Sequence, residues 1–444
     1  MLVDEGDTIA AIATAAGVGG VGIVRLSGPR AIAIACATLG ISEASLDRTI
    51  RVGWARDSQF RRVDQVLAFA MRAPASFTGE DVVELQGHGG SHNLGSLLAC
   101  VVERGARIAE PGEFTRRAVA NGKLDLLRAE ALYAVIHAGS ERALRLAQGN
   151  LEGTLGREVI RLEQRALGVL AEIEGAIDFP EDDLQTRTAD WVGDELVALR
   201  AGCATLAEGF RHGRAVSAGI TAALVGPVNV GKSSLLNALV GTERALVAAA
   251  PGTTRDWLEV SAVWDGIAVV LIDTAGERAT DDPVEQRGIA LGAERVATAD
   301  VVIVVNDGEH PWDRGIRYGT RAVLVRSKVD RGTVAPDDDA TAIATSALTG
   351  QGLDELRRKV LSIAGVAERE GSEHAIVTTA RQQALAASAR DAFDAAHALW
   401  RARRPSEVIA IELRHATQTL AQLRGIEVGD RVLDEVFARF CIGK

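Results

Sequence analysis

One stretch of the chain has the residue types and spacing of a loop that binds polyphosphates: Gly226-Pro-Val-Asn-Val-Gly-Lys232-Ser-Ser234. In such a loop the backbone N–H groups and the positive end of the following helix bind phosphate oxygens. Lys232 then reaches the β- and γ-phosphates, and Ser233 supplies an oxygen to Mg²⁺. The alternative is a glycine turn in an ordinary α/β core, which would need no chemical partners elsewhere in the chain.

Partners follow in order downstream. Gly252-Thr-Thr-Arg-Asp256 lies in a polar connector, where the Thr254 hydroxyl is placed to complete the Mg²⁺ shell once a γ-phosphate is present. Asp273-Thr-Ala-Gly276 ends an apolar run, so we expect the Asp273 carboxylate to hold Mg²⁺, directly or through water. The Gly276 amide is then placed to sense the γ-phosphate. Together these motifs predict a nucleotide-hydrolysing site.

A third motif indicates which base is bound. Ser327-Lys-Val-Asp330 follows the apolar run Ala322–Val325 and precedes Thr345-Ser-Ala-Leu348. An aspartate at position 330 can accept hydrogen bonds from the N1–H and the amino group of guanine, which adenine cannot supply, so GTP is favoured over ATP. Guanine-specific GTPases usually have asparagine where this chain has Ser327. We expect the shorter serine to lose both the contact with the base and the brace to the phosphate loop, which predicts weak, micromolar-type binding and fast exchange.

These motifs need strands and helices to position them. The apolar run Thr221–Val225 and the segment Leu235–Leu239 predict a strand before the phosphate loop and a helix after it. Trp257–Trp264 and Ile267–Ile272 are predicted strands, and Asp265-Gly266 between them favours a tight two-residue hairpin turn. Val301–Val305 is a further buried strand.

The composition limits the class of protein. The formal net charge is −11 and the pI is about 5.4, so bulk attraction to nucleic acid is not expected and any RNA contact must be local. The four cysteines show no Cys-x-x-Cys spacing, which argues against zinc ribbons and fits a reduced cytosol. No apolar run of about 18 residues is present, so we expect a soluble cytoplasmic protein without a membrane span.

The first part of the chain is predicted to be α+β, with strands at Thr8–Ala13 and Val21–Leu26. The glycines at 17–22 match a dinucleotide-binding pattern, but a strand follows them, so no helix begins where a pyrophosphate would need one. His88 and His92 have the spacing of a helical metal pair. Two glycines between them weaken such a helix and no third ligand is evident, so metal binding is not favoured.

From Gly122 onward the pattern changes to that of long helices. Apolar residues recur with three-and-four spacing at Leu151, Leu155, Val159, Leu162, Ala166, Val169, Ile173 and Ile177. A second helical run covers about 190–212, and helix-rich sequence resumes at about 378. The simplest arrangement is a helical domain interrupted by an inserted nucleotide-binding domain.

Along nearly its full length the chain resembles the MnmE (TrmE) family of tRNA-modification GTPases. The matching stretches are Gly20-Val-Gly-Ile-Val-Arg25-Leu-Ser-Gly28, Phe77–Gly90, Glu110-Pro-Gly-Glu-Phe-Thr115, Asn121-Gly-Lys-Leu-Asp125, the nucleotide motifs and Phe440-Cys-Ile-Gly-Lys444. The resemblance implies a multidomain fold. Its expected parts are an α+β folate-binding and dimerisation domain at 1–118, an all-α helical domain at 119–215 and 371–444, and an inserted Ras-like α/β P-loop GTPase domain at 216–370.

The resemblance also implies chemistry beyond what the spacing shows. Members of the family form homodimers and bind 5-formyl- or methylene-tetrahydrofolate. They act with an FAD-containing MnmG-type partner in a heterotetramer. Together they place an aminomethyl-type group, of the carboxymethylaminomethyl class, on C5 of the wobble uridine of certain tRNAs. The implied folate contacts are Arg25, Glu84 and Lys123, with Lys444 close by.

For the nucleotide, the resemblance implies a K⁺-activated site that pairs with a second G domain. Asn229 is an oxygen-bearing side chain beside the phosphates, and the family match assigns K⁺ to it together with Ala248, Ala250 and Thr253. Glu285 takes the place of a water-orienting glutamine, so Glu285, Lys232 and Asn229 are the candidate catalytic residues. The full set of expected GTP contacts is Asn229, Val230, Gly231, Lys232, Ser233, Ser234, Ala248, Ala249, Ala250, Pro251, Gly252, Thr253, Thr254, Asp273, Thr274, Ala275, Gly276, Lys328, Asp330, Ser346 and Ala347.

Three further features have two interpretations each. Cys441 is a nucleophile candidate, but a structural role of the tail in the folate site is favoured. Arg401-Ala-Arg-Arg404 is the best local basic patch and is either a tRNA contact or a solvated helix end. The whole chain could instead be a GTP-dependent RNA or ribosome assembly switch without base-modifying chemistry. A separate basic RNA-binding module would favour that switch, whereas this chain has folate-type motifs and an acidic balance.

Overall fold

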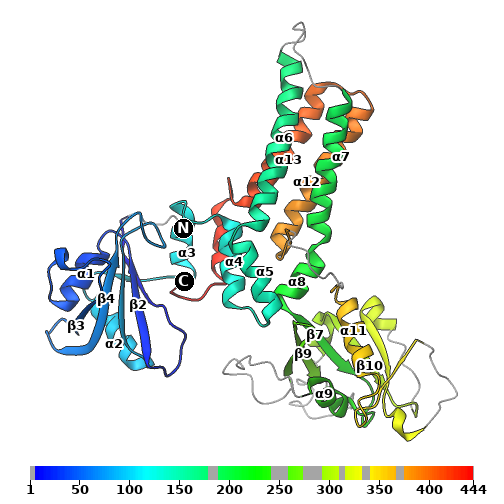
Figure 1. The fold of residues 1–444 in the computed structure, drawn as a ribbon, viewed down its shortest axis with the longest axis horizontal. Coiled ribbons are helices and arrows are strands. Elements are labelled where there is room, and N and C mark those ends of the chain that lie inside the picture. The colour runs from blue at the N-terminus through cyan, green and yellow to red at the C-terminus, as the bar shows by residue number, and fades with distance from the viewer. Residues whose placement is uncertain are drawn as a thin grey trace. The chain divides into compact units, whose positions relative to one another are not determined.

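A computed structural model describes residues 6–178, 189–241, 259–273, 293–309, 316–332, 341–366 and 375–443. The chain divides into two compact units, Met1–Tyr133 with Arg424–Lys444, and Ala134–Leu423 (Figure 1). The fold class predicted from the sequence is confirmed: an α+β part, a helical part and an α/β nucleotide-binding part are all present. The domain boundaries themselves stay predictions.

The first unit contains a six-stranded sheet in the order β3-β4-β5-β2-β1-β6. Its strands are β1 Ile9–Ile12, β2 Val21–Ser27, β3 Arg51–Arg56, β4 Arg62–Met71, β5 Val82–His88 and β6 Arg107–Ile108. All neighbouring strands are antiparallel except β1 and β6. The strand predicted at Val21–Leu26 therefore does follow the glycines at 17–22, which confirms that no helix begins at that loop.

One face of this sheet is buried and the other carries exposed apolar side chains. The helices α1 Ala31–Leu39 and α2 Ser91–Val102 share a hydrophobic core with alternate residues of the strands, such as Val66, Ala68 and Leu85. On β3 and β4 the residues outside that core include the exposed Val52, Trp54 and Leu67, and Val52 lies opposite Leu67.

The end of the chain packs on the same unit. Helix α14 (Asp430–Phe437) lies against α3 (Glu113–Ala120) and the start of α4 (Leu126–Ile136), and Phe437 and Phe440 form a core with Leu126 and Ala129. Ile442 then forms an antiparallel bridge with Pro111. The last residues thus lie beside the sheet that begins the chain.

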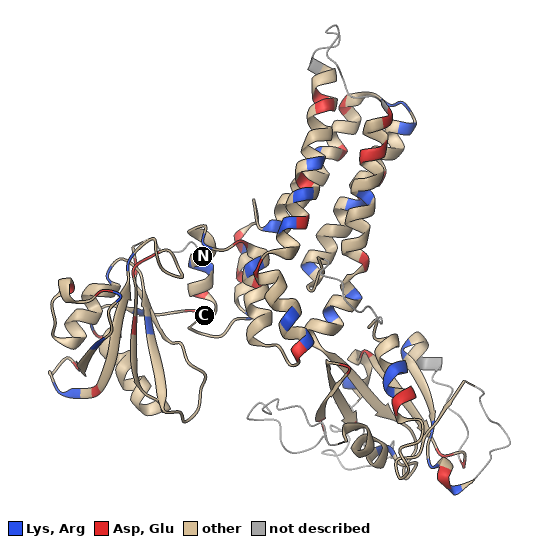
Figure 2. Cartoon of the chain, viewed as in Figure 1, with Lys and Arg blue, Asp and Glu red and all other residues tan. Residues whose placement is uncertain are grey.

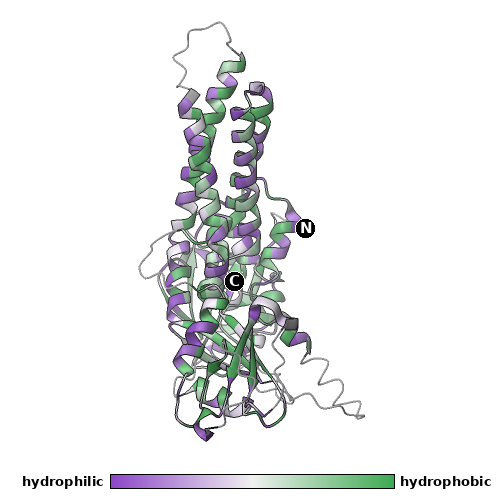
Figure 3. Ribbon diagram, turned by 90° about the vertical axis from the view of Figure 1, so that its right-hand side faces the viewer, coloured by the Kyte–Doolittle hydropathy of each residue, from purple (hydrophilic) through white to green (hydrophobic). Residues whose placement is uncertain are grey.

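The second unit contains long helices on both sides of the nucleotide-binding part. They are α5 Glu141–Leu151, α6 Thr154–Asp178, α7 Ala189–Glu208, α8 Phe210–Ala218, α12 Ala380–Arg401 and α13 Ser406–Arg424, and polar and apolar residues alternate along them (Figure 3). The predicted stripe is buried at Leu155, Val159, Leu162, Ala166, Val169 and Ile173. One detail of the prediction is wrong. Leu151 ends α5 and does not begin the long helix, because the chain breaks at Gly153, whose φ is 95°.

The nucleotide-binding part has a second six-stranded sheet, in the order β12-β11-β10-β7-β9-β8. Its strands are β7 Ile220–Val225, β8 Glu259–Trp264, β9 Ile267–Asp273, β10 Val301–Asn306, β11 Ala322–Arg326 and β12 Ile343–Ala344. The predicted hairpin is confirmed, since β8 and β9 pair antiparallel and both Asp265 and Gly266 have positive φ. All other neighbours are parallel, with α9 Lys232–Val240 and α11 Leu353–Ile363 packed on the core.

This order puts β7 in the middle of the sheet, where the chain turns first toward β9 and β8 and later toward β10. Ligands of open α/β sheets bind beyond the carboxyl ends of the strands at such a point. Over the part of the chain that the structure describes, no helix is long and apolar enough to cross a membrane.

Candidate functional site

The loop at 226–231 has a backbone that its glycines make possible. Gly226 has a φ of 146°, and a Cβ there would lie 2.2 Å from the carbonyl oxygen of Val305. Gly231 has a φ of 97° and is the N-cap of α9, which begins at Lys232. Asn229 takes the left-handed conformation with a φ of 65°. The loop therefore directs the N-terminus of α9 toward the carboxyl end of β7, which is the arrangement that binds phosphate oxygens.

Lys232 is buried and bound to its own loop. Its Nζ donates to the carbonyl oxygens of Gly226 at 2.9 Å and Pro227 at 2.8 Å. Burial lowers the pKa of this ammonium group, and the nearby Asp273 carboxylate opposes that change. A bound polyphosphate would supply a negatively charged partner for this buried ammonium group.

Ser233 and Asp273 bring two oxygens together at the end of β9. The Ser233 hydroxyl donates to Asp273 Oδ2 at 2.6 Å. A hydroxyl and a carboxylate oxygen at this position, next to a phosphate loop, form a hard-oxygen set that suits Mg²⁺, with the remaining ligands coming from water and phosphate.

The guanine-side motif is bound to the phosphate loop. Ser327 is buried, and its hydroxyl donates to the carbonyl oxygen of Val230 at 2.5 Å and approaches that of Asn306 at 3.3 Å. This corrects the expectation that serine loses the brace to the loop. The strand order places the ends of β10 and β11 beside the loop after β7, so a short hydroxyl reaches a backbone carbonyl without the longer side chain of asparagine.

Lys328 and Asp330 are held in a similar way. Lys328 Nζ donates to the Asn229 carbonyl oxygen at 2.6 Å and pairs with the buried Asp307 at 2.9 Å. The Ser346 hydroxyl donates to Asp330 Oδ1 at 2.6 Å, which fixes the carboxylate that would select guanine. Asp307 is not among the residues that the motifs predict. Two polar residues at the end of an apolar run, Asn306 and Asp307, are the sequence signal for it.

Several predicted site residues lie outside the described part of the chain. They are Ala248, Ala249, Ala250, Pro251, Gly252, Thr253, Thr254, Thr274, Ala275, Gly276, Glu285 and Lys444. The predicted residues Asn229, Val230, Gly231, Lys232, Ser233, Ser234, Asp273, Lys328, Asp330, Ser346 and Ala347 all lie in or beside the loop, β9 and the segments after β11 and β12.

Arg25 and Glu84 form a second cluster, in the first unit. They are register partners on β2 and β5, and Arg25 Nη2 lies 2.9 Å from Glu84 Oε1. The guanidinium also lies 5.9 Å from the centre of the Phe114 ring, and its Nη1 is 3.5 Å from the Gly443 carbonyl oxygen. The two residues and the C-terminal tail are thus brought together. Lys123 is exposed and donates to the Pro74 carbonyl oxygen at 2.9 Å.

The two histidines considered as a metal pair do not share a helix. His88 ends β5, where its Nδ1 lies 2.7 Å from the buried Asp64 carboxylate, whereas His92 lies in the first turn of α2. Cys441 is an exposed free thiol, and its carbonyl oxygen accepts from the Gly112 N–H. These positions place Cys441 in the tail beside Gly112, and the neighbouring Lys444 lies outside the described residues.

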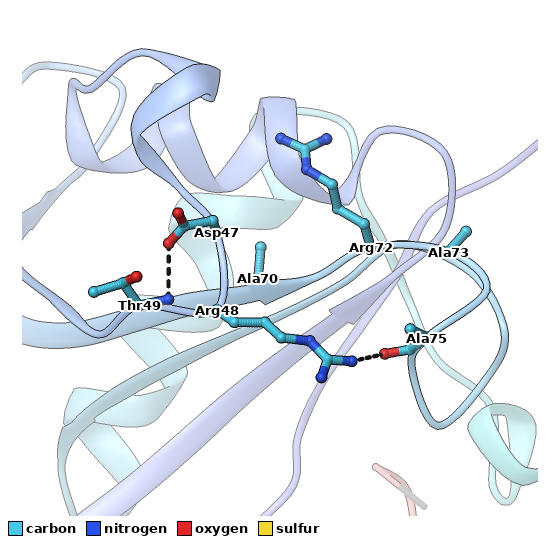
Figure 4. Close-up of a pocket in the computed structure, with 7 residues that line it drawn as sticks. All are labelled: Asp47, Arg48, Thr49, Ala70, Arg72, Ala73 and Ala75. Carbon is cyan, nitrogen blue, oxygen red and sulfur yellow. Dashed lines mark hydrogen bonds between the residues drawn. The ribbon is translucent and has the colours of Figure 1, made fainter.

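A cavity of about 390 Å³ lies on the first unit, lined by Asp47, Arg48, Thr49, Ala70, Arg72, Ala73 and Ala75 (Figure 4). Figure 4 shows the Arg48 guanidinium turned to the Ala75 carbonyl oxygen and the Asp47 carboxylate turned to the Thr49 N–H. Arg48 and Asp47 are thus bonded to other lining residues, whereas the Arg72 guanidinium donates to the Glu43 carbonyl oxygen outside the lining. None of Arg25, Glu84 and Lys123 lines it, so it is separate from the Arg25 cluster.

The whole chain is similar to known proteins. Residues 8–123 match the family model of the GTP-binding protein TrmE N-terminus, and residues 126–441 match that of the MnmE helical domain. The chain is 40% identical over 471 residues to the tRNA modification GTPase MnmE of Symbiobacterium thermophilum, with 99% of each chain covered. It is 42% identical over 454 residues to that of Synechococcus sp. (strain CC9605), again with 99% of each chain covered. Among solved structures, the G domain of the T. maritima FeoB iron transporter is 28% identical, covering 33% of this chain and 98% of that one, with a TM-score of 0.27.

Proposed function

We propose that this chain, which belongs to the MnmE family of tRNA modification GTPases, uses its GTP hydrolysis in the modification of tRNA. The observation that best supports this proposal is that three sequence motifs meet around the phosphate loop at 226–231. Ser233 contacts Asp273, Ser327 contacts Val230, and the carboxylate of Asp330 is fixed by Ser346. A phosphate site, a Mg²⁺ oxygen pair and a guanine-selecting carboxylate at one end of a sheet are what a GTPase requires.

The side chains of the loop perform separate tasks in this proposal. Lys232 exchanges its two carbonyl contacts for β- and γ-phosphate oxygens when GTP binds, and the negative charge restores the stability of its protonated form. Ser233 and Thr254 would hold Mg²⁺, which supplies charge neutralisation between the phosphates. Asp273 would bind it directly or through water. Glu285 would orient the attacking water, and Asn229 with Ala248, Ala250 and Thr253 would bind K⁺.

The K⁺ and Glu285 assignments have a direct test. The rate of phosphate release from GTP should be higher in K⁺ than in Na⁺ buffer at equal ionic strength, and Glu285→Ala should slow it without changing GDP affinity. Equal rates in the two buffers would remove the ion from the proposal. An unaffected Glu285→Ala would remove the carboxylate.

The N-terminal part is proposed to bind 5-formyl- or methylene-tetrahydrofolate through Arg25, Glu84, Lys123 and Lys444. The chemistry of the Arg25 cluster supports this assignment. A partly buried carboxylate, such as that of Glu84, can accept hydrogen bonds from the N–H edge of a pterin, and a guanidinium can bind a glutamyl carboxylate. The nearby Phe114 ring adds an apolar surface.

Homodimer formation is proposed to use the same part of the chain. The exposed face of β3 and β4 supports this, because Val52 is 65% exposed, Trp54 is 38% exposed and Leu67 is 40% exposed on one patch. Contiguous apolar side chains of this kind mark interaction surfaces. We further propose that the chain acts in the cytoplasm with an FAD-containing MnmG-type partner, in a heterotetramer that modifies C5 of the wobble uridine. The proposed domains are the N-terminal one at 1–118, the helical one at 119–215 together with 371–444, and the G domain at 216–370.

Wobble uridines from cells that lack the chain test the whole proposal. Mass spectrometry should show loss of the carboxymethylaminomethyl-type modification, restored by the wild-type chain and not by Lys232→Ala or Ser233→Ala. Normal uridines together with an altered ribosome profile would favour the assembly switch instead.

A further inference from the structure

The turn that joins α12 to α13 carries three arginines in four residues. Arg401, Arg403 and Arg404 are all exposed, and Figure 2 shows positively charged ribbon at this turn. The salt bridges found in the described part of the chain include none that uses these three guanidiniums. Their neighbours on the helices behave differently, since Arg165, Arg200, Arg390 and Arg414 each pair with a carboxylate.

The backbone conformation at Arg403 is one that an arginine rarely adopts. Helix α12 ends in a Schellman motif: the Arg404 N–H donates to the Leu399 carbonyl oxygen, and the Arg403 N–H donates to that of Trp400, each at 3.0 Å. Arg403 occupies the position after the cap, with a φ of 53°. Glycine is favoured there, because a side chain in the left-handed region is strained. Stability alone would select glycine at this position, so the arginine points to a function of its side chain.

The indole of Trp400, next to the patch, is half-buried. A Cβ added to Gly193 of α7 would lie 3.4 Å from Trp400 Nε1, so one edge of the ring packs against α7. The exposed groups of the patch itself are guanidiniums, which bind phosphates without reading bases.

We propose that Arg401, Arg403 and Arg404 form a binding surface for the phosphate backbone of tRNA, read without regard to sequence. The chain carries a net charge of −11, so a local cluster of this kind is what an acidic protein needs to hold a polyanion. The inference rests on the proposed function for the identity of the RNA. It assigns a contact surface that the motifs of the nucleotide and folate sites do not include.

Arg403→Gly separates this role from a structural one. In the full-length chain the substitution should leave the thermal unfolding midpoint equal to or above that of the wild type, because it relieves the strained backbone. Each lost phosphate contact should weaken binding of a tRNA transcript about five- to eightfold at 0.1 M salt and lower the slope of log K against log salt by about 0.7–0.9. The triple variant Arg401→Gln, Arg403→Gly, Arg404→Gln should lose about three such contacts.

Two controls make the result specific. Arg403→Lys keeps the charge and should keep the salt slope. Lys359→Ala removes one exposed cation from α11 and should leave tRNA binding unchanged. Polyglutamate, offered in place of tRNA, tests for an acidic protein partner.

The outcomes decide between the proposals. Wild-type binding of tRNA that is unchanged in the triple variant overturns the surface and leaves the proposed function standing. If the triple variant loses binding of polyglutamate but not of tRNA, the patch is assigned to an acidic protein partner and the RNA inference is overturned. If the wild-type chain binds no tRNA, and the wobble uridines of cells that lack the chain are unchanged, the proposed function is overturned as well.

Discussion

Ser327 sets the affinity for nucleotide in a way that substitution can resolve into two parts. Its hydroxyl donates to the Val230 carbonyl oxygen at 2.5 Å and so braces the phosphate loop. What serine lacks is an amide that reaches the guanine base. One missing neutral hydrogen bond corresponds to about 0.5–1.5 kcal/mol, or roughly a two- to twelvefold change in affinity. We therefore expect Ser327→Asn to bind GDP about two- to twelvefold more tightly than the wild type.

Ser327→Ala should move the affinity in the opposite direction. It removes the donor and leaves the buried Val230 carbonyl oxygen without the Ser327 hydroxyl, a loss that costs about 1–3 kcal/mol in proteins. Part of that cost should appear in nucleotide binding, because the carbonyl belongs to the phosphate loop. We expect GDP affinity to fall severalfold and the unfolding midpoint to fall with it.

Titration with a fluorescent GDP analogue, and with GTP as competitor, measures both effects. Dissociation rates from stopped flow should show fast release in the wild type without an exchange factor, and slower release in Ser327→Asn. Asp330→Asn, which should shift preference toward xanthine nucleotides, is the control for a correctly bound base. Equal GDP affinity in the wild type, Ser327→Ala and Ser327→Asn would refute the reasoning, because neither the brace nor the missing amide would then matter.

Three further outcomes follow from the described contacts. Asp307→Asn removes the charge that holds Lys328 against the loop and should weaken GDP binding severalfold, measured by the same titration, with Asp354→Asn as a surface control. Burial opposes the charged form of Glu113, but hydrogen bonds from Arg107 and Arg117 outweigh it and lower the pKa of the carboxyl. The contribution of Glu113 to folding stability should therefore be present above the unfolded pKa near 4.5 and be lost as the pH falls below it. Urea unfolding midpoints measured against pH should lose this contribution in Glu113→Gln. A fragment of residues 1–118 should bind reduced folate more weakly than the full-length chain, because it lacks both Lys123 and the tail that contacts Arg25, and equal calorimetric affinities would contradict both roles.

The local features of the nucleotide site could be predicted because each depends on a short stretch of sequence. A buried strand, two glycines and a helix start fix the phosphate loop, and Asp265-Gly266 fixes a hairpin turn by backbone preference alone. The break at Gly153 could not be separated from a continuous stripe, because apolar spacing runs through both helices. A single glycine in a helical pattern costs only about 1 kcal/mol and does not decide a boundary.

Contacts between distant segments could not be predicted in the same way. The tail at 441–443 lies beside Arg25 because Ile442 bridges to Pro111, a pairing that no local pattern encodes. Arg403 looked like part of a charged helix end, and only its φ of 53° reveals that its backbone is strained.

The strand order explains why serine is tolerated at 327. Strand β10 pairs with β7 on one side and β11 on the other, so the segments that follow these three strands leave the sheet side by side. The Ser327 N–H donates to the Asn306 carbonyl oxygen at 2.8 Å, which fixes the residue before its side chain makes any contact. From that position a hydroxyl is long enough to reach Val230, and Lys328 can reach Asn229 with support from Asp307. The phosphate loop is thus braced twice by backbone-directed contacts. A change at 327 should therefore alter how tightly guanine is held while leaving the sheet in place, and the loop keeps its second brace through Lys328.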